Sequence, residues 1–201
     1  MKKILLVMAA MLCVATVSAQ SKWAAGLRIG SGLQAQGEYT YADNRYVEAR
    51  FGMGWFGGIN ADFTALHNWN VCNWDWTPSV GSWYLDAGVG INIGGGAKTL
   101  SSVYYEGYYA GWVHGTTVYG GVAGQVKFGI KFKKVPIRLS IDYTPVLGVA
   151  GSYANAAGKK ELKEANAELE AMGEPGRFKV KDAHFYGAGL GNFGISATYC
   201  F

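Results

Sequence analysis

Apolar and polar residues alternate along about eight segments of the chain, each roughly ten residues long. In residues 82–93 the odd-numbered positions are all apolar, whereas the even-numbered positions are glycine, tyrosine or more polar residues. Successive side chains of a β-strand point to opposite faces, so each segment has one apolar and one polar face. The pattern predicts an all-β fold of eight antiparallel strands.

The chain ends inside such a segment, with the sequence ISATYCF from Ile195 to Phe201. Ile195, Tyr199 and Phe201 share one face of the predicted strand. A strand at an open sheet edge exposes unpaired N–H and C=O groups, which invite aggregation. We therefore expect the last strand to pair with the first one, which closes the sheet into a barrel.

The first residues have the pattern of a secretory signal peptide. Lys2 and Lys3 are basic, residues 4–14 are apolar, and Val17-Ser18-Ala19 is a cleavage site of small residues. We expect residues 1–19 to be removed during secretion across the inner membrane, which leaves a barrel over residues 20–201. The apolar run is too short for a membrane-spanning helix, and no later stretch is apolar enough. A membrane protein with this sequence would therefore cross with strands.

The polar faces of the predicted strands carry charges of both signs. Without Lys2 and Lys3 the formal net charge is 16 − 14 = +2, which is no basis for binding nucleic acid. Charged groups inside a narrow barrel are tolerated only when they are paired. We therefore predict a charge network in the lumen, formed by Arg28, Glu38, Glu48, Arg50, Asp62, Asp86, Lys127, Arg138 and Asp142.

Alternation alone leaves two orientations open, a barrel with lipid outside or a soluble barrel with an apolar cavity. A soluble ligand-binding barrel would turn its large apolar side chains inward. Aromatic residues gather near the predicted strand ends, as in the girdles of membrane barrels. They are Trp23, Tyr41, Trp83 and Phe201 at the inner end and Trp55, Trp112 and Tyr119 at the outer end. We favour the membrane barrel, whose narrow interior leaves no open pore.

The connections between strands differ in length. The turns at 43–44 and 133–136 are short, and we place them in the periplasm, whereas 94–115 and 148–183 are long extracellular loops. Residues 68–82 break the rule as a longer inner turn. The last loop is strongly charged, and its residues Leu162, Ala165, Leu169 and Met172 fall at helical spacing. Either a short amphipathic helix or a solvated, mobile loop fits this stretch.

The terminal ISATYCF and the segment GIKFKKVPIRLSIDYTP (residues 129–145) resemble small eight-stranded outer-membrane β-barrel proteins of the OmpA/OmpX type. The second segment is similar to a strand-turn-strand in a widespread, functionally uncharacterised branch of these barrels. The resemblance covers the whole mature chain, and it implies residence in the outer membrane among outer-membrane lipid and lipopolysaccharide. It also implies that the assembly machinery recognises Tyr199 and Phe201. No peptidoglycan-binding domain follows, so the cell-wall tether of larger members is not expected.

Two sets of residues raise chemical possibilities. Cys72 and Cys200 follow the signal peptide, and they form either a disulfide at the barrel base or two free thiols that are too far apart. His114 and His184 fall near the outer rim with Ser101, Ser102, Ser152 and Asp182. Some small barrels that this chain resembles modify lipid A with His and Ser, but such chemistry needs a base within reach of a nucleophile. The spacing here does not establish that reach.

These observations favour a non-enzymatic protein with a structural or surface-interaction role. The two long outer loops form its expected contact region, and its extracellular partner is unknown. The aromatic and glycine-rich stretch from Tyr104 to Gly115 suits either recognition of a partner or, as we slightly favour, an interfacial extension of the barrel above the headgroups. Two alternatives remain, a lipid A-modifying enzyme and a narrow ion channel lined by residues such as Arg138 and Asp142. We expect no metal and no cofactor, because no ligand cluster or phosphate-binding loop stands out.

Overall fold

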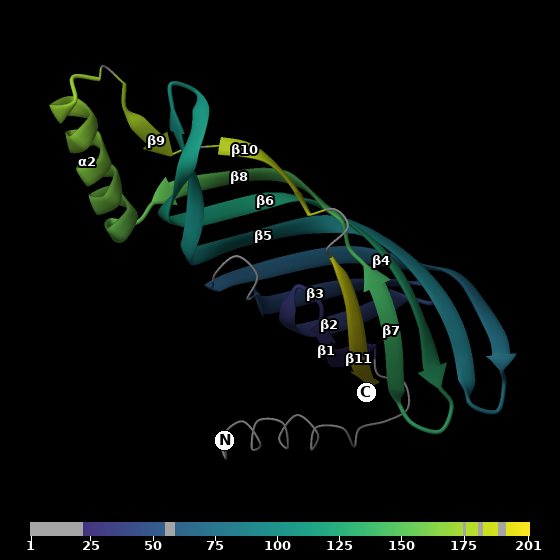
Figure 1. The fold of residues 1–201 in the computed structure, drawn as a ribbon. Helices are drawn as coiled ribbons and strands as arrows, with labels where there is room; N and C mark the ends of the chain where they lie inside the picture. The colour runs from purple at the N-terminus through teal and green to yellow at the C-terminus, as the bar shows by residue number, and fades with distance from the viewer. Residues whose placement is uncertain (1–21, 55–58, 175, 181–182, 189–191) are drawn as a thin grey trace, which may run out of the picture.

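The computed structural model describes residues 22–54, 59–174, 176–180, 183–188 and 192–201. Within these ranges eleven antiparallel strands form one sheet, and a helix lies at one end of it (Figure 1). The strands are β1 (Trp23–Ile29), β2 (Gly32–Ala42), β3 (Arg45–Gly54), β4 (Ile59–Thr77), β5 (Gly81–Tyr105), β6 (Tyr108–Phe132), β7 (Ile137–Tyr143), β8 (Val146–Ala154), β9 (Phe178–Val180), β10 (Ala183–Ala188) and β11 (Phe193–Cys200). The predicted all-β antiparallel class is confirmed. The predicted signal peptide, residues 1–19, lies outside the described residues.

Eight of the strands close into a ring in the order β1-β2-β3-β4-β5-β6-β7-β11. β11 pairs with β1, with Ile195 opposite Ile29 and Cys200 opposite Ala24. The last strand therefore lies beside the first, as its alternation predicts. Closure removes the free strand edges at the level of the ring.

Three further strands correct the predicted total of eight. β7 and β8 both pair with β6, and they are separated at Pro145, which has no N–H to donate to a ladder. β10 and β11 repeat this division, because β10 pairs with β8 and β11 pairs with β7. β7 and β8 thus form one long, interrupted strand, and β10 and β11 form another. The short β9 is additional and pairs with the tip of β5.

Two segments that the sequence predicts as loops are strands. In residues 68–82, β4 continues to Thr77 and β5 begins at Gly81, so the inner turn is only 78–80. In residues 94–115, β5 and β6 continue as a long hairpin to a turn at Glu106 and Gly107. Both turn residues have positive φ, 49° and 89°, which suits a two-residue hairpin turn. Gly94, Gly95 and Gly96 are strand residues because β4 and β6 pair with them on both sides.

The stretch 148–183 contains the rest of β8, then the helix α2 (Ala156–Ala171), and then β9. Asn155 caps α2, because its side chain accepts a hydrogen bond from the Gly158 N–H at 3.0 Å. α2 lies beyond the end of the sheet, beside β9 and the β5–β6 hairpin (Figure 1). Of the two interpretations of this stretch, the structure therefore has the helix. No helix in the described ranges is long and apolar enough to cross a membrane.

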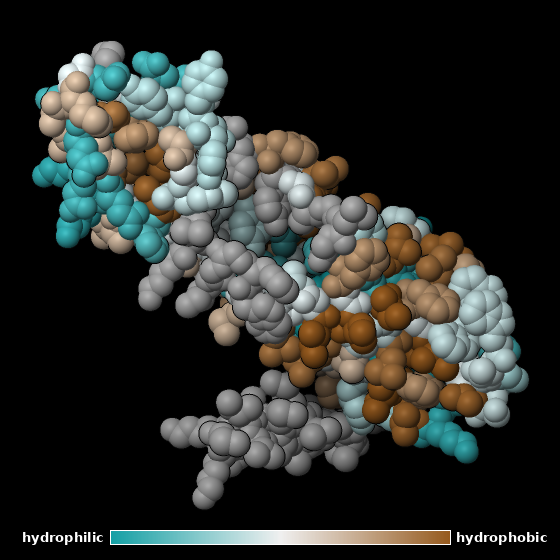
Figure 2. Space-filling model, in the orientation of Figure 1, coloured by the Kyte–Doolittle hydropathy of each residue, from teal (hydrophilic) through white to brown (hydrophobic). Residues whose placement is uncertain are grey.

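The inside of the ring is polar and its outside is apolar. Arg28, Arg50 and Lys127 are each only 1% exposed, whereas Ile195 is 64% and Phe51 is 61% exposed. Figure 2 shows hydrophobic side chains gathered over the wall of the ring and hydrophilic ones over α2. The apolar faces of the ring strands thus point outward, which is the reverse of a soluble barrel with an apolar cavity.

Of the predicted girdle residues, one points inward and one cannot be placed. Tyr119 is partly buried on the β6 face that also carries the buried Ala123 and Gln125, so it points inward and is no girdle residue. Trp55 lies outside the described residues. At the inner end, Trp23 and Tyr39 are neighbours with ring centroids 4.6 Å apart, and Trp23 is 59% exposed.

Candidate functional site

The most unusual site in the molecule is a network of charged side chains inside the ring. At one end of the network Arg28 of β1 meets Asp142 of β7, with Nη2 2.9 Å from Oδ1. Arg28 also donates to Gln34 at 2.9 Å, and Gln34 donates to Asp62 at 2.8 Å. Alternation places all four side chains on the inner face, and ring closure brings β1 and β7 to either side of β11.

The middle of the network joins charges from three other strands. Glu48 of β3 accepts from Arg50 Nε at 2.5 Å and from Lys127 Nζ at 2.6 Å. Lys127 also lies 3.2 Å from Glu38 Oε1, and Arg138 donates to the other oxygen of Glu38. Arg50 Nη1 lies 3.5 Å from Asp142, which links this chain of charges to the Arg28 end.

Asp86 is held by neutral groups. It accepts hydrogen bonds from the Tyr46 hydroxyl and from the Asn70 side chain, each at 2.8 Å. The nine residues predicted for the lumen therefore all hydrogen-bond to other polar side chains inside the ring. Four are cations and five are anions, so the network nearly neutralises itself.

Sequence analysis missed the neutral members of this network. Gln34, Tyr46, Asn68, Thr144 and Ser196 each bond to one or more of the charged groups. All of them lie at the inward-facing positions of their segments, so the alternation of faces in the sequence could have identified them. These neutral donors and acceptors add hydrogen bonds to the buried charges, which limits the desolvation penalty, although Arg50 Nη2 and Arg138 Nε have no hydrogen-bond partner among the described residues.

Most of the charged groups of the network are buried inside the ring. Seven of its nine charged residues are buried, and Asp62 and Arg138 are partly exposed, with 17% exposure of the Arg138 side chain. A ring of eight strands is just wide enough for its own side chains. This arrangement can support the wall of the ring from inside. No cluster of three or more potential metal ligands occurs in the described part of the chain.

The predicted assembly residues lie at the closure point of the ring. Tyr199 of β11 is in register with Ala25 of β1 and with Ile137 of β7. Phe201 packs against Tyr199, with ring centroids 5.3 Å apart, and its N–H donates to the Trp23 carbonyl at 3.1 Å. Both aromatic residues therefore belong to the seam where the first and last strands meet.

Cys72 and Cys200 are free. Cys72 lies in β4 opposite Leu85, not in an inner turn as the sequence predicts, and Cys200 lies in β11 opposite Ala24. β4 and β11 are four steps apart in a ring of eight strands, on opposite sides of it. The disulfide that the sequence left open is therefore not formed, and the interpretation as two free thiols describes the structure.

The residues considered for enzymatic chemistry do not converge. His114 of β6 is exposed and its Nδ1 lies 2.6 Å from Glu161 of α2, whereas Ser101 is buried on the other face of the hairpin. Ser102 is in register with Trp112, and Ser152 bonds to Thr117 at 3.1 Å. His184 is in register with Ala150, while Asp182 lies outside the described residues. The hydrogen bond of Glu161 to the His114 side chain lowers the pKa of this carboxyl group.

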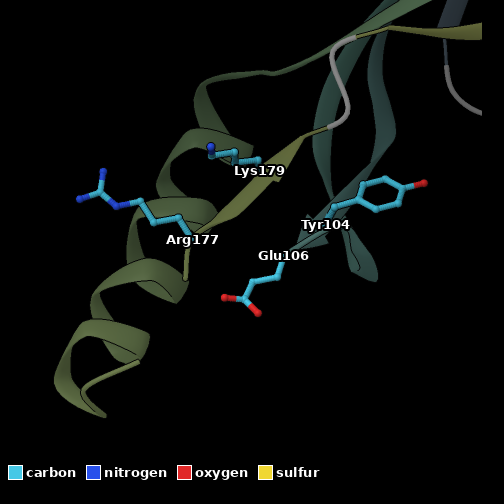
Figure 3. Close-up of a pocket in the computed structure, with 5 residues that line it drawn as sticks. Tyr104, Glu106, Arg177 and Lys179 are labelled. Carbon is cyan, nitrogen blue, oxygen red and sulfur yellow. The ribbon is translucent and has the colours of Figure 1, made fainter. Parts of the chain in front are cut away.

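A shallow pocket of about 400 Å³ lies between the tip of the β5–β6 hairpin and the segment that leads into β9. Tyr104, Glu106, Gly107, Arg177 and Lys179 line it. In Figure 3 the Tyr104 side chain points away from Arg177 and Lys179, so the polar groups do not aim at a common point. This pocket is a gap between surface elements and not a preorganised ligand site.

The fold and the network together define a class of protein, a closed antiparallel ring with a paired polar interior and an apolar exterior. No protein-family model matches the sequence, and no curated protein matches it. Among solved structures, the chain is similar to the N-terminal β-barrel domain of OprF from Pseudomonas aeruginosa. The two share 9% sequence identity with a TM-score of 0.39, over 89% of this chain and 95% of that domain.

Proposed function

We propose that this protein is an integral outer-membrane β-barrel with a structural or surface-interaction role and no open pore. The observation that supports the proposal best is the inversion of the ring, with charges inside and large apolar side chains outside. Phe51, Met53, Ile141 and Ile195 are all more than half exposed along the ring wall. Such a surface is unfavourable in water and favourable against lipid tails.

In the proposed orientation, the first strand of the ring begins and the last strand ends at the periplasmic side. Trp23 and Phe201 lie together at one end of the ring, with the short turns at 43–44 and 133–136. The long β5–β6 hairpin, α2 and β9 lie at the opposite end (Figure 1). Short periplasmic turns and long outer segments are the usual asymmetry of bacterial barrels.

The proposed contact region is the tip of the β5–β6 hairpin together with α2. Tyr108 is 80% exposed, and Tyr109 and Trp112 are also more than half exposed. Exposed aromatic side chains provide large contact area at low entropic cost, so they suit recognition of another surface. Lipopolysaccharide surrounds this region in the proposed orientation.

The first test is the gel mobility of the detergent-extracted outer-membrane fraction, with and without boiling. We expect the unheated protein to run faster than the boiled protein, because a closed ring keeps its compact shape in detergent. Planar-bilayer recordings of the same preparation should show no steady conductance, and neutralising Arg138 should not create one. Recovery in the soluble periplasm without a mobility shift would refute the membrane proposal, and a steady conductance would refute the closed interior.

A further inference from the structure

The outer face of the ring carries a groove where four strands present small residues side by side. Ala25, Gly37, Ala49 and Ala65 are in register across β1, β2, β3 and β4. A Cβ atom added at Gly37 would have no neighbour within 4 Å, so the floor of the groove is open. The cavity over this row measures about 600 Å³.

Large side chains line the groove on its inner side, in a row that contains Trp23, Tyr39, Val47, His67 and Val89. The next row toward the outer end contains Leu27, Ala35, Phe51, Phe63 and Ile93. Glu38 and Glu48 also line the cavity, but their side chains are committed to the internal network. The groove is therefore an apolar depression on a face that we propose lies against lipid.

A second, smaller cavity adjoins the groove at its inner end, and the exposed Arg45 is one of its lining residues. It measures about 350 Å³ and is lined by Asn44, Arg45, His67 and Trp69, so His67 borders both cavities. Arg45 is exposed and makes no ion pair with any described residue. His67 is hydrogen-bonded to the Tyr41 hydroxyl and lies beside Trp69, with ring centroids 6.1 Å apart. Asp43, in the same turn, is not among the lining residues.

The two cavities and the exposed Arg45 together suit a phospholipid, with the apolar groove for an acyl chain and the cation at the headgroup level. Ala49 is four residues from Arg45 along β3, which is about 13 Å along the strand and, at a strand tilt of about 40°, about 10 Å into the bilayer. One leaflet has a hydrocarbon depth of about 15 Å. Arginine binds phosphate oxygens in a bidentate manner, and tryptophan favours the headgroup level.

We infer that this groove binds one anionic phospholipid of the periplasmic leaflet, with its phosphate at Arg45 and an acyl chain over Gly37 and Ala49. The inference rests on the proposed membrane location. A polar residue such as His67 is costly on a lipid-facing surface, and a headgroup beside the Tyr41–His67 pair places it in the interface. The small residues then let the acyl chain lie against the backbone of the strands.

The test is native mass spectrometry of the full mature protein, folded in mild detergent and titrated with dioleoylphosphatidylglycerol. We expect one retained lipid, and weaker retention of dioleoylphosphatidylcholine, which has the same chains but no net charge. Arg45→Gln should lower retention of the anionic lipid about fivefold, because one cation beside an anionic headgroup contributes a binding free energy of that size. Lys134→Gln removes an exposed cation from another turn at the same end and should change nothing.

Ala49→Leu should lower retention about threefold, because the added side chain occupies the groove and displaces a few dispersion contacts of the acyl chain. Ala197→Leu adds the same side chain at another exposed alanine of the ring and serves as its control. Unheated gel mobility of each variant verifies folding and separates the two proposals. If the protein is heat-modifiable but all four variants retain lipid like the wild type, the lipid site is wrong and the membrane-barrel proposal stands. A dimer that Ala49→Leu dissociates while lipid retention stays constant would also overturn the lipid site, since the groove would then bind a second copy of the chain.

Discussion

At the residue scale, the interior of this protein depends on matching every buried charge to several partners. Asp142 shows how this is done. It lies within 3.5 Å of two arginines, Arg28 and Arg50, and also accepts hydrogen bonds from Thr144 and Ser196. Each partner comes from an inward-facing position. Loss of one charge therefore affects the whole cluster, because the opposite charges stay buried without compensation.

Asp142→Asn should lower the free energy of unfolding by about 3–5 kcal/mol, the usual effect of leaving a buried ion pair with one partner. Urea unfolding in lipid vesicles, followed by tryptophan fluorescence, would measure the change. Asp43→Asn makes the same chemical change in an exposed turn and should alter stability by no more than about 0.5 kcal/mol. Equal effects of the two substitutions would contradict the role assigned to the network.

At the element scale, α2 is attached to the β5–β6 hairpin by a few polar contacts around His114. The carboxylate of Glu161 accepts from the His114 backbone N–H at 3.1 Å and lies 2.6 Å from its ring. The Asn155 N–H donates to the His114 carbonyl at 3.2 Å, and a Cβ atom at Gly158 would clash with the same carbonyl. The helix is thus held at its N-terminal end, on the exposed side of the sheet.

Acid should release this attachment. The hydrogen bond from His114 lowers the pKa of Glu161, so the contact adds stability at pH values above the ordinary glutamate pKa. That stability is lost as the pH falls through the lowered pKa of Glu161. The amide proton shift of His114, followed by NMR in micelles, should titrate with a midpoint below the ordinary glutamate value, and Glu161→Gln should remove the titration. A midpoint at or above that value would show that the contact does not persist in solution.

The cap of α2 makes a separate prediction. Asn155→Ala removes the acceptor for the Gly158 N–H, which should destabilise the helix locally by about 1 kcal/mol. Amide hydrogen exchange over residues 157–171 should then accelerate about fivefold, while exchange in the ring strands stays unchanged. Equal acceleration in the ring would mean that the helix and the ring unfold as one unit.

At the scale of the whole molecule, the inverted ring makes its stability depend on the medium outside. Ile195 is 64% exposed on the outer wall, opposite Ile29 and Ile141. In water an exposed isoleucine is replaceable at little cost. Against the middle of a bilayer the same position must remain uncharged.

Ile195→Arg should therefore lower stability in vesicles by about 2–4 kcal/mol, the range for a cation near the bilayer midplane. Urea titration of refolded protein would measure the difference, with Ile195→Leu as the control for the loss of the native side chain. If arginine and leucine had equal effects, within about 0.5 kcal/mol, the outer wall would face water and the membrane proposal would fail.

Much of this architecture was predictable because alternation is a local property of the chain. The period of two in β3 and β5 identifies their inner and outer faces without knowledge of any partner strand. The tall β5–β6 hairpin was not predictable in this way. Glycines at 94–96 favour a loop in isolation, and only pairing with β4 and β6 makes them strand residues. The interruption at Pro145 likewise depends on a ladder that the sequence does not show.

The sequence by itself determined that the protein is built of antiparallel strands, which side chains share a face, and that the last strand must pair. The tertiary structure alone decided which distant residues meet. Arg28 and Asp142 are 114 positions apart, and Cys72 and Cys200 are separated across the ring. The register that aligns Gly37, Ala49 and Ala65 is equally invisible in the chain. The physical reason is that face assignment depends on neighbours two residues away, whereas register depends on the simultaneous closure of all eight ring strands.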